Sequence, residues 1–175
     1  MNIILQDNPD KIFILNFNMD IKIRRARESD SEEIGNMYFD TVNAINSKDY
    51  PKEKIDVWAA SGKKFDKWKK KISEQYFLVA EADNIITGIS SIDQTGYLDF
   101  MYVHKDYQRM GIAQALLNEI ERKASEQKNS EIWAYVSLTA DPFFKKNGYV
   151  FTGEKIIVIQ GVEFVDRILK KKLKY

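Results

Sequence analysis

The sequence predicts a single mixed α/β domain built around a mostly antiparallel, twisted sheet. Strand-like runs at residues 76–82, 85–92 and 97–103 are joined by two short turns, which is typical of an antiparallel meander. A helical pattern over 111–124 then leads to another apolar strand at 131–137. Such a crossover is right-handed and makes the strands on its two sides parallel, so we expect one parallel pair beside the meander.

Three helices are expected before the meander. Ser29 and Glu32 have the Ser-x-x-Glu spacing of a capping box, so the first helix should cover residues 29–46, with apolar side chains every three or four positions. A proline in the first turn favours a second helix over 51–59, and a third should cover 63–73.

The end of the chain reads as a short helix followed by a hairpin. Pro142 suits the first turn of a helix that runs to Lys146. Two strands, 149–159 and 162–173, flank a Gln-Gly turn and should pair antiparallel.

Before the first strand, residues 21–24, the chain lacks the features of a targeting signal. Residues 1–18 have neither the basic start nor the small-residue cleavage site of a signal peptide. We therefore divide the chain into an N-terminal extension, 1–18, and one domain, 19–175. The apolar run 12–15 could still pair on a sheet edge.

The composition is that of a globular domain. Of 175 residues, 44% are hydrophobic and 30% charged, and no apolar run reaches the ~20 residues that cross a bilayer. A net charge of +1 gives no indication of a nucleic-acid partner. The lack of cysteine excludes disulfides and thiolate chemistry, and one histidine argues against a zinc site. We expect a cytoplasmic protein that uses no metal, nucleic acid or membrane.

The most informative motif is Gln108-Arg109-Met110-Gly111-Ile112-Ala113, which lies between the last meander strand and the crossover helix. It fits the pattern Gln/Arg-x-x-Gly-x-Gly/Ala. Unpaired N–H groups at a helix start and the positive end of the helix dipole favour a pyrophosphate. Gly111 lets the phosphate approach the main chain, and Ala113 keeps the path narrow without blocking it.

With its surroundings, this motif resembles the pyrophosphate-binding motif of the GNAT N-acetyltransferases, where a strand ending in Tyr-Val, here Tyr102 and Val103, leads into the turn. The segment from Ser137 to Tyr149 is similar to that family's second signature, Asn-x-x-Ala-x-x-x-Tyr-x-x-x-Gly-Phe. The resemblance covers residues 21–173. It implies the GNAT fold, with a splayed parallel strand pair and helices on both faces, and acetyl transfer from acetyl-CoA to an amine.

The resemblance also implies where coenzyme A binds. The pantetheine arm would enter between the splayed strands, where backbone N–H groups would bind it or polarise the thioester carbonyl. The phosphates would bind main-chain amides of the Gly-rich turn, with Gln108 buttressing the loop and Arg109 either contacting phosphate or merely exposed. The residues expected to hold the cofactor are Met101, Tyr102, Val103, Gln108, Arg109, Met110, Gly111, Ile112, Ala113 and Phe144.

The catalytic groups are less evident. Phe144 stands where many family members have an acid Tyr, and Ser137 stands where they have Asn. The departing thiolate must then be protonated by water or by another hydroxyl, and the nearest candidates are Ser137, Tyr135 and Thr139, although each is also an ordinary strand-end polar residue.

Asp99 is the candidate base, because alternation along the strand puts it on the same face as Met101 and Val103. A carboxylate in an apolar strand is costly to bury, which suggests that it has a function. The alternative is an Asp that is ion-paired or lies at a bulge.

In the resembled family the first helical region shapes the acceptor pocket. Tyr38, Tyr50 and Trp58 are therefore candidate substrate contacts, with core packing as the alternative. The expected acceptor is a small-molecule or peptide amine, and the protein could be a homodimer. A second possible function is a catalytically weak acyl-CoA-binding or sensing module, which Phe144 favours.

Overall fold

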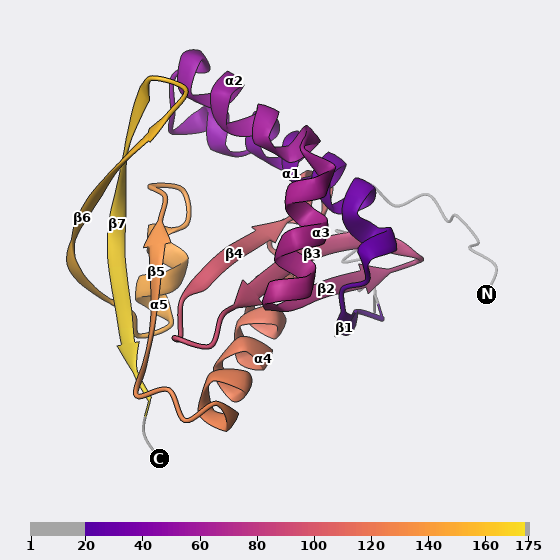
Figure 1. The fold of residues 1–175 in the computed structure, drawn as a ribbon, viewed down its shortest axis with the longest axis vertical. Coiled ribbons are helices and arrows are strands. Elements are labelled where there is room, and N and C mark those ends of the chain that lie inside the picture. Colours follow the sequence, from indigo (N-terminus) through magenta and orange to yellow (C-terminus); the bar gives the residue numbers. More distant parts are fainter. Residues whose placement is uncertain (1–19, 174–175) are drawn as a thin grey trace, which may run out of the picture.

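The computed structural model describes residues 20–173, and the predicted extension, residues 1–18, lies outside them. The helices and strands follow the predicted order (Figure 1). They are β1 (Lys22–Arg25), α1 (Ser31–Ala44), α2 (Lys52–Ala60), α3 (Phe65–Glu74), β2 (Tyr76–Ala82), β3 (Ile85–Ile92), β4 (Leu98–Val103), α4 (Ile112–Glu126), β5 (Glu131–Val136), α5 (Asp141–Lys146), β6 (Val150–Ile159) and β7 (Val162–Lys172). Among the described helices, none has the length and apolar character needed to cross a bilayer.

The strands form two antiparallel sheets that meet at one point. The first has the order β1-β2-β3-β4, and the second has the order β5-β7-β6. A parallel bridge joins Tyr97 to Trp133, and the N–H of Trp133 donates to the carbonyl of Gly96 at 3.0 Å. Beyond this bridge β4 and β5 diverge (Figure 1). The predicted splayed parallel pair is therefore confirmed.

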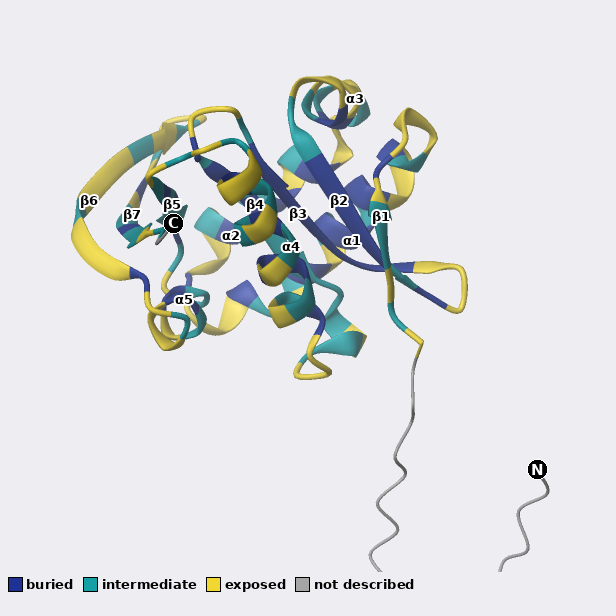
Figure 2. Cartoon of the chain, turned by 90° about the horizontal axis from the view of Figure 1, so that it is seen from below, coloured by how far each residue is buried: buried dark blue, intermediate teal, exposed yellow. Residues whose placement is uncertain are grey.

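The terminal hairpin is also confirmed, and its second strand lies inside the second sheet. β7 pairs with β6 on one side and with β5 on the other. This insertion brings one face of β7 beside the place where β4 and β5 part. The outer strand, β6, is exposed along much of its length (Figure 2).

Two apolar cores lie on the two faces of the first sheet. Helices α1, α2 and α3 cover one face, around the buried rings of Trp68 and Phe77. Helix α4 covers the other through Leu116 and Ile120, which pack with Leu169 of β7. Helices on both faces were predicted, and burying both faces explains why β2 and β3 consist almost entirely of buried residues.

The capping box predicted at Ser29 and Glu32 is wrong. A short 3₁₀ turn precedes α1, and the carboxylate of Asp30 accepts the N–H of Arg27 at 2.7 Å. Asp30 also accepts a hydrogen bond from the Arg24 guanidinium of β1 at 2.7 Å, so the observed cap lies two residues before the predicted one.

Candidate active site

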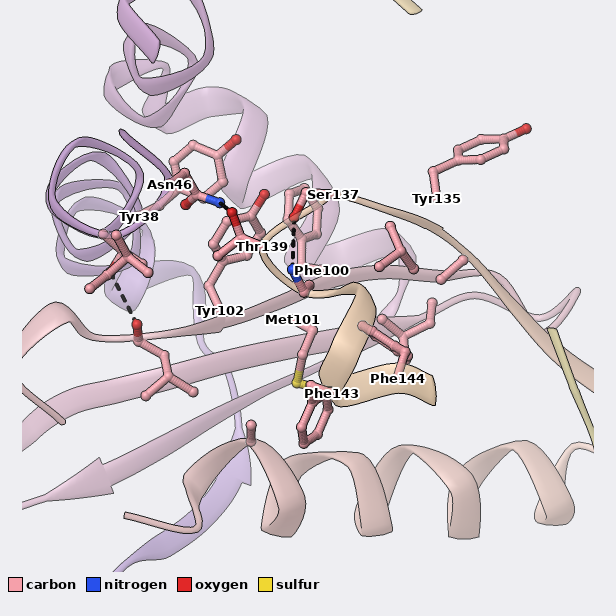
Figure 3. Close-up of a pocket in the computed structure, with 18 of the residues that line it drawn as sticks. Tyr38, Asn46, Phe100, Met101, Tyr102, Tyr135, Ser137, Thr139, Phe143 and Phe144 are labelled. Carbon is pink, nitrogen blue, oxygen red and sulfur yellow. Dashed lines mark hydrogen bonds between the residues drawn. The ribbon is translucent and has the colours of Figure 1, made fainter. Parts of the chain in front are cut away.

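A cleft of ≈ 1280 Å³ opens where β4 and β5 separate. One end reaches the turn before α4. The other end lies among α1, α2 and the inner face of the β6–β7 hairpin. Most of the sequence-predicted site residues line this cleft from separate elements, and Tyr50 and Met110 are the exceptions (Figure 3).

The turn before α4 has a backbone suited to an anion. Arg109 (φ 63°) and Gly111 (φ 85°) both adopt the left-handed region, which makes a concave run of amides. The first backbone hydrogen bond of α4 joins the N–H of Ala115 to the carbonyl of Gly111, so the preceding N–H groups have no acceptor within the helix. A side chain added at Gly111 would meet nothing within 4 Å, so the amides face open space.

Gln108 fastens this turn to the end of β4. Its side-chain amide donates to the carbonyls of Val103 at 2.6 Å and His104 at 3.2 Å. The hydroxyl of Thr41 in α1 donates to the same Val103 carbonyl at 3.2 Å. The Gln108 side chain therefore buttresses the loop, and its amide nitrogen is already engaged.

The edge of β4 that faces β5 carries free backbone donors. The N–H of His104 donates to Thr87 of β3 at 2.8 Å, and alternate residues of a strand direct their N–H groups to the same edge. The N–H groups of Met101 and Val103 therefore point away from β3, into the gap. Within residues 20–173, β5 pairs with this side of the sheet only through the bridge at Tyr97, so no strand takes these donors.

The end of β5 supplies a hydroxyl beside an apolar wall. The Ser137 oxygen accepts the N–H of Ala140 at 3.3 Å, which leaves its own proton available (Figure 3). Phe144 is 3% exposed and stacks edge-on against Phe143 and Tyr149. It therefore contributes an apolar ring and no proton donor.

Tyr135 lies apart from Ser137, with which it was predicted to share a role. Its ring packs against Tyr97 and Trp133, with centroid distances of 5.6 and 5.4 Å. In Figure 3 the side chain points away from Ser137 and Phe144. The alternation of β5 explains this, because Ala134 and Val136 take the buried positions against α4.

Asp99 lines the cleft, and its setting matches the alternative raised for it, a bulge and an ion pair. Ser91 pairs with Phe100 while Ile92 pairs with Leu98, so Asp99 is the extra residue of a β-bulge. Its carboxylate accepts hydrogen bonds from Lys71 at 2.6 Å and Gln75 at 2.8 Å.

The expectation that Asp99 shares a face with Met101 and Val103 is therefore wrong. Those two side chains pack toward α4, whereas Asp99 bonds to side chains on and just beyond α3. The bulge breaks the alternation on which the prediction rested.

Of the three predicted substrate contacts, Tyr38 belongs mainly to the core. It is 3% exposed and packs against Trp68 and Tyr102. Its hydroxyl oxygen accepts a hydrogen bond from Ser61 at 3.3 Å. Burial raises the pKa of Tyr38 and that of Tyr102, so both rings stay neutral.

Trp58 and Phe164 form an aromatic wall at the far end of the cleft, and Tyr50, which is 9% exposed, packs against Trp58 and is not among the residues that line the cleft. The Tyr50 hydroxyl accepts the N–H of Leu138 at 2.8 Å, which ties this wall to the end of β5. Trp58 stacks edge-on against Tyr50 at 5.3 Å and against Phe164 of β7 at 6.1 Å.

The cleft also contains charged residues that the sequence did not identify as site residues, and burial shifts the pKa of two of them. Asp166 of β7 faces the cleft, and burial raises the pKa of its carboxyl group. Lys67 of α3 lies over the rings of Tyr38 and Phe100, and burial lowers the pKa of its ammonium group. Alternation puts Asp166 on the same face of its strand as Phe164 and Ile168, but it does not indicate that this face lines the cleft.

The sequence of the domain matches one protein family. Residues 46–170, more than two thirds of the chain, match the family model of the acetyltransferase (GNAT) domain. The chain belongs to the GNAT acetyltransferase family. This match confirms the resemblance to the GNAT family that the motifs at residues 108–113 and 137–149 indicated.

Relatives of this GNAT domain span almost its full length. YafP of Escherichia coli K12, an uncharacterized N-acetyltransferase, is 27% identical over 153 residues, which are 87% of this chain and 96% of YafP. A GCN5-related N-acetyltransferase from Rhodopseudomonas palustris has a similar fold, with a TM-score of 0.84 and 23% identity over 87% of this chain and 95% of that one. PaiA N-acetyltransferase from Thermoplasma acidophilum, solved in complex with coenzyme A, has a TM-score of 0.74 and 23% identity over 89% of this chain and all of PaiA.

The GNAT cleft of this chain has a donor set that fits coenzyme A. Free main-chain amides at the start of α4 suit a pyrophosphate, and the free N–H groups of Met101 and Val103 suit the amide carbonyls of a pantetheine arm. Both sets of donors open into the same cleft.

Proposed function

We propose that this protein is an N-acetyltransferase that moves the acetyl group of acetyl-CoA to the amine of a small molecule or peptide. The observation that carries the proposal is the pairing, in one cleft, of an anion-binding helix start with an unpaired strand edge. Membership of the GNAT family supports it, as do relatives solved with coenzyme A and with acetyl-CoA.

In this proposal the protein binds and orients its two substrates for direct transfer. Bound acetyl-CoA supplies an activated acetyl carbonyl, and the amine nitrogen forms a bond to that carbon as the bond from carbon to sulfur breaks. The N–H groups of Met101 and Val103 either bind the pantetheine arm or stabilise negative charge on the carbonyl oxygen. The amides of Gly111, Ile112 and Ala113, with Met110 and Arg109 beside them, hold the phosphates.

Two proton transfers accompany this step. The acceptor must lose a proton from its ammonium group, and Asp99 receives it directly or through water. The departing thiolate must gain a proton, and the free hydroxyl proton of Ser137 is the donor with the best access; Tyr135 is the second candidate. Phe144 packs beside the thioester and excludes water.

The alternative is a catalytically weak module that binds or senses acyl-CoA. It is favoured by the apolar ring of Phe144 and by the engagement of Asp99 with Lys71 and Gln75, which compete for the proposed base. In either case we place the protein in the cytoplasm.

Release of free thiol from acetyl-CoA in the presence of an amine panel separates the two functions. We expect amine-dependent release, together with binding of acetyl-CoA in calorimetry. Binding without release for any amine would establish the sensing module, and absence of binding would remove both functions.

A further inference from the structure

The far end of the cleft has aromatic walls around one carboxylate. Trp58 of α2 and Phe164 of β7 stack there, and Tyr50 joins them to the end of β5. Ile157 of β6, which pairs with Phe164, lines the same end. Asp166 follows Phe164 by two residues and lies on the same face of β7.

The register of β7 places Asp166 near the proposed site of transfer. Val136, the last residue of β5, pairs with Arg167. Continuing this antiparallel register by one residue puts Asp166 opposite Ser137, the proposed proton donor. Asp166 thus lies where the aromatic end of the cleft meets the gap between β4 and β5.

Among the described residues no cation makes an ion pair with the Asp166 carboxylate, although Lys155 of β6 is its cross-strand neighbour. Its neighbour Arg167 turns to the other face of β7 and binds Asp141 at 3.0 Å. Lys71 is held by Asp99, and Lys67 lies over aromatic rings on the α3 side. Residues 20–173 supply no hydrogen bond or ion pair to the Asp166 carboxylate, and burial alone raises its pKa.

The charge of Asp166 acts on the tyrosines of the cleft. It contributes to the raised pKa values of Tyr50, Tyr97 and Tyr102, after the larger effect of their burial. A half-buried carboxylate without a partner destabilises a fold, and such a group lining a cleft is typical of a ligand site.

We propose that Asp166 binds the ammonium group of the acceptor, and that the wall of Trp58 and Phe164 takes an aromatic or alkyl skeleton attached to it. The acceptor class is therefore small primary amines with an apolar body. An ammonium ion next to these rings gains cation–π attraction as well as the ion pair. A carboxylate beside the amine, as in a free amino acid, would lie next to Asp166 and be repelled. This inference names the substrate class of the proposed acetyltransferase and rests on that function.

Binding of two isosteric probes, measured by calorimetry with coenzyme A present, tests the ammonium site without requiring turnover. The probes are 2-phenylethylamine and 2-phenylethanol, which share a skeleton and differ in charge. The native protein should bind the amine at least about tenfold more tightly than the alcohol. Asp166→Asn should abolish this difference. Glu163→Gln, which removes an exposed carboxylate from the same strand, should preserve it.

Trp58→Ala should weaken both probes to a similar extent, because it removes part of the apolar wall and no charge. Equal affinity of the native protein for amine and alcohol, absence of amine binding, or an undiminished preference in Asp166→Asn would overturn the inference. Failure of the acetyltransferase proposal would look different: the amine would bind as described while no thiol is released from acetyl-CoA.

Discussion

Two carboxylates, Asp99 and Asp166, face the cleft from different strands, and their surroundings differ in one respect. Asp99 is paired with a lysine and an amide, whereas Asp166 has no partner among the described residues. The first was predicted from its place in an apolar strand. The second was not, because nothing in the sequence indicates that β7 inserts beside β5 and turns this face toward the cleft.

The unpartnered state of Asp166 predicts a pH-dependent gain of stability on its removal. Burial raises the pKa of Asp166 in the fold, so the folded protein binds that proton more tightly than the unfolded chain does. Ionisation therefore costs stability as the pH rises above the unfolded value of about 3.9. Asp166→Asn should melt higher than the native protein near neutral pH, by roughly 2–4 °C for each kcal/mol of cost removed.

This gain should shrink as the pH falls toward about 4 and vanish below it, where the carboxyl group is protonated in the unfolded state as well. Thermal melts of both proteins at neutral and acidic pH measure it. A lower melting temperature for Asp166→Asn near neutral pH would mean that the carboxylate has a stabilising partner.

The ring of Phe144 predicts the outcome of restoring a hydroxyl at that position. General acid catalysis contributes ~10²–10⁴-fold when the donor is well placed. If water or a poorly placed hydroxyl now protonates the thiolate, Phe144→Tyr should raise kcat with acetyl-CoA affinity unchanged. If Ser137 already does so, Phe144→Tyr gains nothing and Ser137→Ala slows turnover. Steady-state kinetics decide between them, and loss of turnover in Phe144→Tyr with cofactor binding intact would contradict the assignment of a vacant acid position.

At the scale of elements, the start of α4 is where sequence and structure agree most closely. The Gly-rich pattern specifies a local backbone, and the left-handed conformations of Arg109 and Gly111 are a local property. The strands 76–82 and 85–92 were likewise predicted with their observed bounds, since short turns and apolar runs are local signals. The bulge at Asp99 was only one of two alternatives at the level of the sequence, because it depends on pairing with β3.

Gly111→Asp should remove cofactor binding and leave the fold intact. The substitution puts a negative charge on the amides proposed to hold the phosphates. Gly161 in the β6–β7 turn is a matched control, since it has φ 83° against 85° for Gly111 and its added side chain also meets nothing within 4 Å. Calorimetry should show acetyl-CoA binding lost in Gly111→Asp and retained in Gly161→Asp. Equal affinities in the two variants would contradict a phosphate site at this turn.

At the scale of the molecule, the exposed β6 edge predicts association of two copies. Ile156 and Val158 are 60% and 59% exposed on the outer strand of the second sheet, and Val165, which pairs with Ile156, is also exposed. Unpaired strand edges with apolar side chains favour pairing with another chain. Sedimentation should give a dimer for the native protein and a monomer for Ile156→Glu; a monomeric native protein would contradict this expectation.

The arrangement of the two sheets explains which parts of the site could be predicted from the sequence. The cofactor end depends on one turn and one strand edge, both encoded within residues 97–113. The acceptor end depends on α2, β6 and β7, which are distant in sequence and meet only in the fold. Tyr50 and Trp58 were predicted through the family resemblance, whereas Phe164 and Asp166 required the structure.

The central claim is that acetyl-CoA lies along the open edge of β4. Amide hydrogen exchange, followed residue by residue in NMR spectra with and without coenzyme A, tests it most directly. The N–H groups of Phe100 and Tyr102 face β3 and should exchange slowly in both states. Those of Met101 and Val103 should exchange fast in the free protein and become protected when coenzyme A binds. Binding of coenzyme A that leaves the exchange of Met101 and Val103 unchanged would contradict the account.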